Sequence, residues 1–179
     1  MRADDKSSVK QEMKSDNRVC GSCTACCEGW LVSDVVDMHP GKPCRHCTSE
    51  GCSIYEQRPE RPCRTFSCSW LTEDVPLPDS ARPDQSGIIL SRLGSWGLWP
   101  VLAATPTGAS FDSPTFDFLK SFCTENNVAI LFAELEMIDE AFTGRGWQKT
   151  FGPEDFMSAL RSGDNVDALW ELGNRVGRV

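Results

Sequence analysis

Apolar residues in the second half of the chain follow the periods of regular secondary structure. Two apolar runs, Gly87–Leu93 and Trp96–Ala104, are separated by Gly94-Ser95. Apolar runs joined by a short glycine-containing turn predict a β-hairpin. Val128–Phe132 is a further short apolar run and is typical of a strand. We therefore expect β structure on both sides of residue 110.

Helical patterns occur in the same half of the chain. Ser113-Pro114 is typical of a helix start, because serine caps the first turn and proline suits the first helical position. The apolar residues that follow are spaced three and four apart along one face, at Phe116, Leu119, Phe122 and Cys123. Two more helices are expected at Pro153–Arg161 and Asn165–Asn174. With the hairpin, these three helices predict a small α+β unit over residues 87–179.

The pattern changes before residue 87. Residues 1–18 are rich in both charges and contain no apolar core, which predicts a disordered lead. Residues 19–71 hold four prolines and few large apolar side chains, so we expect a loop-rich module that depends on cross-links for its fold. Residues 72–86 carry Pro76, Pro78 and Pro83 and predict a stiff connector.

Nine of the ten cysteines fall in the module, in the order C-x2-C-x2-C-C-x16-C-x2-C-x4-C-x10-C-x4-C from Cys20 to Cys68. Thiols at this density form either a disulfide framework or a metal site. Residues 1–18 lack the continuous hydrophobic segment of a secretory signal, which favours a cytoplasmic protein. Cytosolic thiols are kept reduced, so the spacing favours metal over disulfides.

A C-x2-C step lets the backbone turn and aim two sulfurs at one ion, at about 2.3 Å for zinc. Cys20, Cys23 and Cys26 make two such steps in succession, as in bacterial ferredoxins that hold three corners of a [4Fe–4S] cluster. Cys27 departs from the ferredoxin run. Side chains of neighbouring residues diverge, so Cys26 and Cys27 more easily serve two centres, or one centre with a spare thiol, than one ion. Two zinc sites of four cysteines, or one cluster with additional thiols, both fit the spacing.

Three other residues have simpler interpretations. Cys123 lies on an apolar helical face and is expected to be a buried small side chain. His46 is close enough to Cys44 to join a mixed site, although a lone histidine is more often an ordinary hydrogen-bonded residue. Cys47 is either a ligand or a bystander.

The segments "CGSCTACC" and "CRHCTSEGCSIYEQRPERPCRTFSCSWL" resemble the bacterial YkgJ-like cysteine-cluster proteins, described as a zinc- or iron-chelating CxxCxxCC domain. "RPDQSGIIL" from Arg82 resembles the segment that follows in many members. The resemblance covers residues 19–93 closely and the rest loosely. It implies metal chelation by eight thiols: Cys20, Cys23, Cys26, Cys27, Cys44, Cys52, Cys63 and Cys68. A flagellin lysine methyltransferase carries a similar cluster, so the module can accompany an enzyme.

The sequence predicts a metal-binding protein that holds Zn2+ or iron, including iron in a [4Fe–4S] cluster, for metal handling, redox chemistry or binding of an unidentified protein. The alternative is an enzyme, or an enzyme accessory, that uses an iron–sulfur cluster in redox or methyltransferase-associated chemistry. The chain has no P-loop, Rossmann glycine run or H-E-x-x-H motif, so no catalytic residue is assigned. The formal charge of −8 disfavours nucleic acid and membrane partners.

Overall fold

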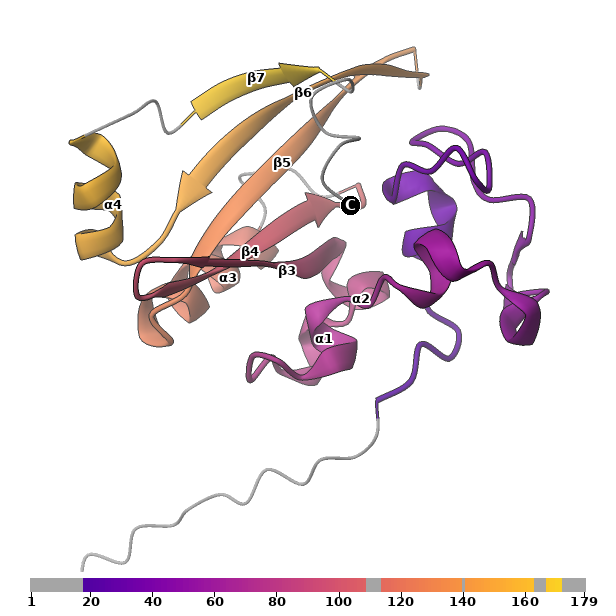
Figure 1. Cartoon of the computed structure of the whole chain (residues 1–179), viewed down its shortest axis with the longest axis horizontal. Coiled ribbons are helices and arrows are strands. Elements are labelled where there is room, and N and C mark those ends of the chain that lie inside the picture. The colour runs from indigo at the N-terminus through magenta and orange to yellow at the C-terminus, as the bar shows by residue number, and fades with distance from the viewer. Residues whose placement is uncertain (1–17, 109–113, 140, 163–166, 172–179) are drawn as a thin grey trace, which may run out of the picture.

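The computed structural model describes residues 18–108, 114–139, 141–162 and 167–171. Within these ranges the protein is a mixed α and β structure with two sheets (Figure 1). A search of the described helices finds none that combines the length and the apolar character needed to cross a bilayer. The cysteine module lies beside one end of the larger sheet, and helix α4 lies at the opposite end.

The larger sheet has five strands in the order β3-β4-β5-β6-β7. Its strands are β3 (Ile88–Trp96), β4 (Trp99–Pro106), β5 (Ala129–Ile138), β6 (Ala141–Phe151) and β7 (Asp167–Glu171). Neighbouring strands are antiparallel except β4 and β5, which are parallel. A parallel pair needs a crossover connection, and helix α3 (Pro114–Glu125) supplies it.

The predicted hairpin is confirmed, but its turn lies further along the chain. Strands β3 and β4 pair from Ile88 opposite Pro106 to Trp96 opposite Trp99, so the turn is Gly97-Leu98. Gly94, expected in the turn, lies at a shift in register after Arg92 and has a φ of +135°. A glycine in an apolar run is compatible with either a bulge or a turn. Because the two strands stay paired beyond Gly94, this glycine lies in a bulge.

Helix α3 covers one face of the sheet and confirms the helix predicted after Ser113, which itself lies outside the described residues. Its buried positions are the four that the periodicity indicates: Phe116, Leu119, Phe122 and Cys123. Phe116 packs edge-on against Phe132 of β5, with ring centroids 4.4 Å apart. The predicted strand at Val128–Phe132 is also confirmed, and it continues to Ile138.

The C-terminal predictions are right for one helix and wrong for the other. Helix α4 (Glu154–Arg161) matches its prediction, and its Phe156 packs edge-on against Trp96 and Trp99. The helix expected at Asn165–Asn174 is instead strand β7 within the described part of that range, while residues 165–166 and 172–174 lie outside it. Strand β6 offers a free edge, and pairing with that edge overrides helical propensity. Strand β6 itself was not predicted, because its glycines interrupt the apolar alternation.

The cysteine module consists of short elements joined by loops. They are the helical turn η1 (Cys26–Trp30), strands β1 (Cys47–Thr48) and β2 (Gly51–Cys52), and the helical turns η2 (Tyr55–Gln57) and η3 (Glu60–Arg64). Helix α1 (Ser69–Thr72), turn η4 (Asp79–Ala81) and helix α2 (Pro83–Ser86) connect this module to β3.

Two hydrophobic cores stabilise the molecule. The larger one joins the α3 side of the sheet to Trp70, Val75 and Leu77 of the connecting elements. The smaller one lies inside the cysteine module, and its buried members among the described residues are Val36, Met38 and Cys44. The module therefore has little apolar burial of its own, as its sequence indicates.

Candidate metal centre

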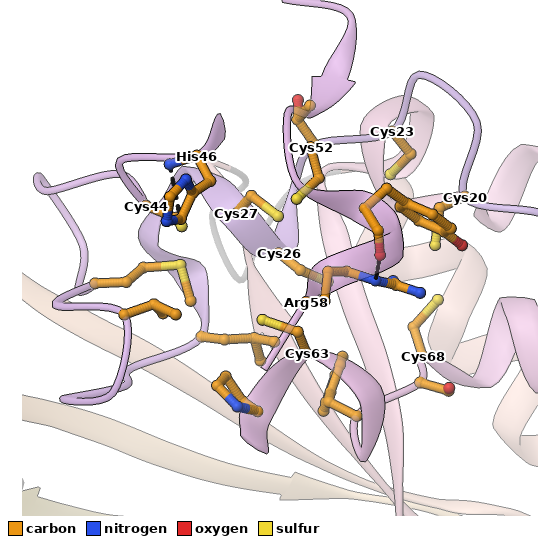
Figure 2. Close-up of a pocket in the computed structure, with 18 of the residues that line it drawn as sticks. Cys20, Cys23, Cys26, Cys27, Cys44, His46, Cys52, Arg58, Cys63 and Cys68 are labelled. Atoms are coloured by element: carbon orange, nitrogen blue, oxygen red, sulfur yellow. Dashed lines mark hydrogen bonds between the residues drawn. The ribbon is translucent and has the colours of Figure 1, made fainter. Parts of the chain in front are cut away.

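Eight thiols line one cavity of about 110 Å3 in the cysteine module (Figure 2). They are Cys20, Cys23, Cys26, Cys27, Cys44, Cys52, Cys63 and Cys68. These are the eight residues that the sequence resemblance implies as ligands. Roughly 10–15 Å3 of such space holds one water molecule, so the cavity has room for metal ions. Its remaining wall is largely apolar.

Tight turns bring the first four of these thiols to the cavity. The backbone N–H of Cys23 donates to the carbonyl oxygen of Cys20 at 2.9 Å, which closes the first C-x2-C step. The N–H of Cys27 donates to the carbonyl oxygen of Thr24 at 2.7 Å and starts η1. Cys26 and Cys27 are consecutive on this turn, so their side chains leave the backbone in different directions.

Gly29 allows the chain to turn back after these two cysteines. Its φ is +103°, a conformation that only glycine adopts readily. A Cβ atom at this position would also collide with the backbone carbonyl group of His39. Any larger residue therefore displaces the loop that carries Cys44.

Replacing Gly29 by alanine is expected to destabilise the cysteine module by at least about 2 kcal/mol, because backbone strain and a steric clash add. Gly94→Ala is the matched control: its φ is also positive, but a Cβ there meets no atom within 4 Å. Thermal unfolding followed by circular dichroism measures both variants. Equal losses in the two variants would contradict the role given to the clash at Gly29.

A small hairpin presents the next thiols. Strands β1 and β2 place Cys47 directly opposite Cys52. The backbone N–H of Cys47 donates to the carbonyl oxygen of Cys44 at 2.9 Å, and the N–H of His46 donates to the Cys44 sulfur at 3.4 Å. Donation of N–H groups to sulfur stabilises a thiolate, which is the form that binds metal. The His46 ring also lines the cavity, whereas Cys47 does not.

The last two thiols come from the segment that leads to the sheet. Cys63 lies in η3, and Cys68 is the residue that precedes helix α1. Burial raises the pKa of Cys68, and the backbone N–H groups of Leu71 and Trp70 in the first turn of α1 oppose part of that rise. Cys68 and Trp70 belong to the larger core, so this part of the site is anchored to the sheet.

Electrostatic contacts divide the eight thiols into two groups of four. Cys26 interacts most strongly with Cys68, then with its chain neighbour Cys27, and then with Cys23 and Cys20. Cys68 interacts with Cys20 and Cys23. We call these four the first thiol group: Cys20, Cys23, Cys26 and Cys68. Cys27 interacts most strongly with Cys47, and then with Cys52, Cys44 and Cys63. We call the cavity-lining members of this set the second thiol group: Cys27, Cys44, Cys52 and Cys63.

The packing of the side chains supports the same division. Cys23 and Cys26 contact the larger core together with Cys68. Cys27, Cys47 and Cys63 contact the smaller core, which contains Cys44. In Figure 2, Cys27 and Cys44 lie on one side of the cavity, and Cys20, Cys23 and Cys68 lie on the other. The two groups meet at the consecutive residues Cys26 and Cys27.

Burial strongly raises the pKa of two neighbouring thiols in the cavity, Cys26 and Cys27. Burial, followed by the charge of Cys68, raises the pKa of Cys26 far above its ordinary value. Burial, followed by the charge of Cys47, raises the pKa of Cys27 to about 12. A bound cation reverses this preference, because it stabilises thiolates that otherwise repel one another.

The side chains in the described ranges do not yet converge on one point. No three cysteine, histidine, aspartate or glutamate side chains there are placed to hold an ion together. All ten cysteines are free thiols. The donor set fits zinc or an iron–sulfur cluster in chemistry and number, and coordination would require rotations of the cysteine side chains toward the cavity.

Two arginines approach the thiols. Arg58 and Arg82 both lower the pKa of Cys20, against the larger effects of burial and of Cys23 that raise it. Arg82 also donates to the carbonyl oxygen of Cys20 at 3.0 Å and to Ser22 Oγ at 3.2 Å. Arg82 thereby ties the first C-x2-C turn to the connector, a role that nothing in the sequence pattern indicated.

Comparisons with known proteins add no assignment. The chain has no match among family models, curated proteins or solved structures.

Two cysteines lie outside the cavity. Cys47 borders the second thiol group, with electrostatic contacts to Glu28, Cys44 and Cys52. Cys123 is fully buried on helix α3, inside the larger core. The expectation that Cys123 is a buried small side chain is confirmed, and whether Cys47 is a ligand stays open.

Proposed function

We propose that this protein binds metal through two four-cysteine centres, formed by the first and the second thiol group. The observation that carries the proposal is the division of eight thiols around one cavity into two sets of four. Four thiolates complete the tetrahedral coordination of a structural zinc ion, and they also hold one iron–sulfur cluster. The centres would cross-link a module that has little hydrophobic core.

Elemental analysis and a visible absorption spectrum of protein purified without oxygen test this proposal. Two zinc ions per chain and no colour would indicate two structural zinc sites. Iron with acid-labile sulfide and a broad visible band would indicate a cluster. Protein that is folded, reduced and free of metal after expression in metal-supplemented medium would contradict the proposal.

An enzymatic or redox use of an iron–sulfur cluster is the second candidate function. It is favoured by an adjoining, more open cavity that shares Cys20 and Cys63, one residue of each thiol group, with the thiol cavity. A reactive cluster needs such access for a substrate or an electron donor, whereas a purely structural zinc site is closed. The same spectrum, repeated after addition of dithionite, distinguishes a redox-active cluster from zinc.

A further inference from the structure

A second cavity, of about 350 Å3, lies beside the thiol cavity and is more open to solvent. Two thiols line both cavities, Cys20 of the first thiol group and Cys63 of the second. The remaining wall combines charged side chains with the apolar Phe66 and Leu71. A molecule in this cavity would therefore contact charged side chains and also one cysteine of each proposed centre, Cys20 and Cys63.

Arg58 is the central polar group of this wall. Its Nε donates to the carbonyl oxygen of Tyr55 at 2.7 Å, and its guanidinium carbon lies 3.5 Å from the centroid of the Tyr55 ring. Stacking and hydrogen bonding fix the guanidinium plane. The two terminal nitrogens of Arg58 make no hydrogen bond within the described part of the chain, so they remain available to a ligand. Figure 2 shows the side chain extending along the cavity toward Cys20.

The charge of the second cavity matches one carboxylate. Arg58 and Arg64 contribute two positive charges, and Glu56 contributes one negative charge. Arg64 is held in place by donation to the carbonyl oxygens of Arg58 and Glu56. A single carboxylate balances the resulting net charge of +1, whereas a doubly charged phosphate exceeds it. The planar fork of Arg58 suits a carboxylate, and Phe66 and Leu71 suit a short organic body.

We propose that this cavity binds small carboxylate-bearing thiols, the chemical class of cysteine and its short peptides. The carboxylate pairs with Arg58, and the thiol lies beside Cys20 and Cys63. If Cys20 or Cys63 holds a metal, the incoming thiol could replace that cysteine as a ligand, and its proton would pass to the displaced cysteine, so that protons and ligands balance. The inference rests on the proposed function, since the thiol needs a metal to bind.

Isothermal titration of the full chain with three probes tests the inference. The probes are N-acetyl-L-cysteine, its amide, which lacks the carboxylate, and N-acetyl-L-alanine, which lacks the thiol. N-acetyl-L-cysteine is expected to bind about tenfold more tightly than the amide, the effect of one charge-assisted pair. It is also expected to bind more tightly than N-acetyl-L-alanine.

The variant Arg58→Gln is expected to lose the preference for the carboxylate, and Arg61→Gln is the matched control. Arg61 lies on the same segment but lines neither cavity. Equal binding of the amide, equal binding of the alanine probe, or an unchanged preference in Arg58→Gln would each overturn the inference. Metal content is measured on the same samples. Metal-free protein contradicts the proposed function, whereas loaded protein without these preferences contradicts only the ligand assignment.

Discussion

Cys26→Ser and Cys27→Ser are each expected to halve the metal content of the protein, although the two residues are neighbours in the chain. The strongest interaction of Cys26 is with Cys68 of the first thiol group, whereas Cys27 interacts with Cys47 and then with the three other members of the second group. Serine removes one thiolate of four, which abolishes tight binding in the affected group and leaves the other group complete. Elemental analysis of the purified variants gives the metal content per chain.

Double variants show whether the division into groups is right. Cys26→Ser combined with Cys20→Ser is expected to lose no more metal than either single variant, because both residues belong to the first group. Cys26→Ser combined with Cys63→Ser is expected to lose both centres. Equal losses in the two double variants would refute the division.

Cys123→Ala is the control for these measurements. Cys123 lies in the larger core against the sheet and outside the cavity. Its substitution is expected to leave the metal content unchanged. Loss of one equivalent in this variant would show that thiols elsewhere in the fold affect metal content indirectly.

Removal of metal is expected to unfold the cysteine module while the five-stranded sheet stays folded. The smaller core has three buried members among the described residues, whereas the sheet and α3 share the larger one. Binding of a structural zinc ion contributes about 10–16 kcal/mol to folding of small zinc modules, far more than so small a core can supply. Hydrogen exchange read by mass spectrometry is expected to show lost protection in peptides from residues 19–67, with protection retained in β4 and β5. Uniform loss across the chain would contradict this division of stability.

Acid is expected to release the metal, because protons and metal compete for the same cysteine sulfurs. The raised pKa values of Cys26 and Cys27 mean that protons compete with metal for these sulfurs throughout the neutral range. Metal affinity therefore falls as pH falls, by about tenfold per pH unit for each proton displaced. A chelator competition assay at two pH values checks this sign.

The hydrophobic pattern predicted the elements whose apolar residues show a regular spacing within one segment or two consecutive segments. Helix α3 and helix α4 follow from the spacing of apolar residues, and the β3–β4 hairpin follows from two apolar runs. Strand β7 and the bulge at Gly94 form because a neighbouring strand is available for pairing. The sequence of either segment alone therefore does not predict them. Strand β6 has polar and glycine positions that become part of a sheet only because β5 lies beside it.

The sequence by itself determined where the thiols concentrate, with nine of the ten between Cys20 and Cys68, and the sequence resemblance implies eight of them as ligands. Only the tertiary structure decided how they divide. Cys68 joins Cys20, Cys23 and Cys26, and Cys27 turns to the loop that carries Cys44. These contacts depend on the reversal at Gly29 and on the docking of α1 against the sheet. Spacing limits where a thiol can reach, but the path of the backbone between distant cysteines sets which thiols meet.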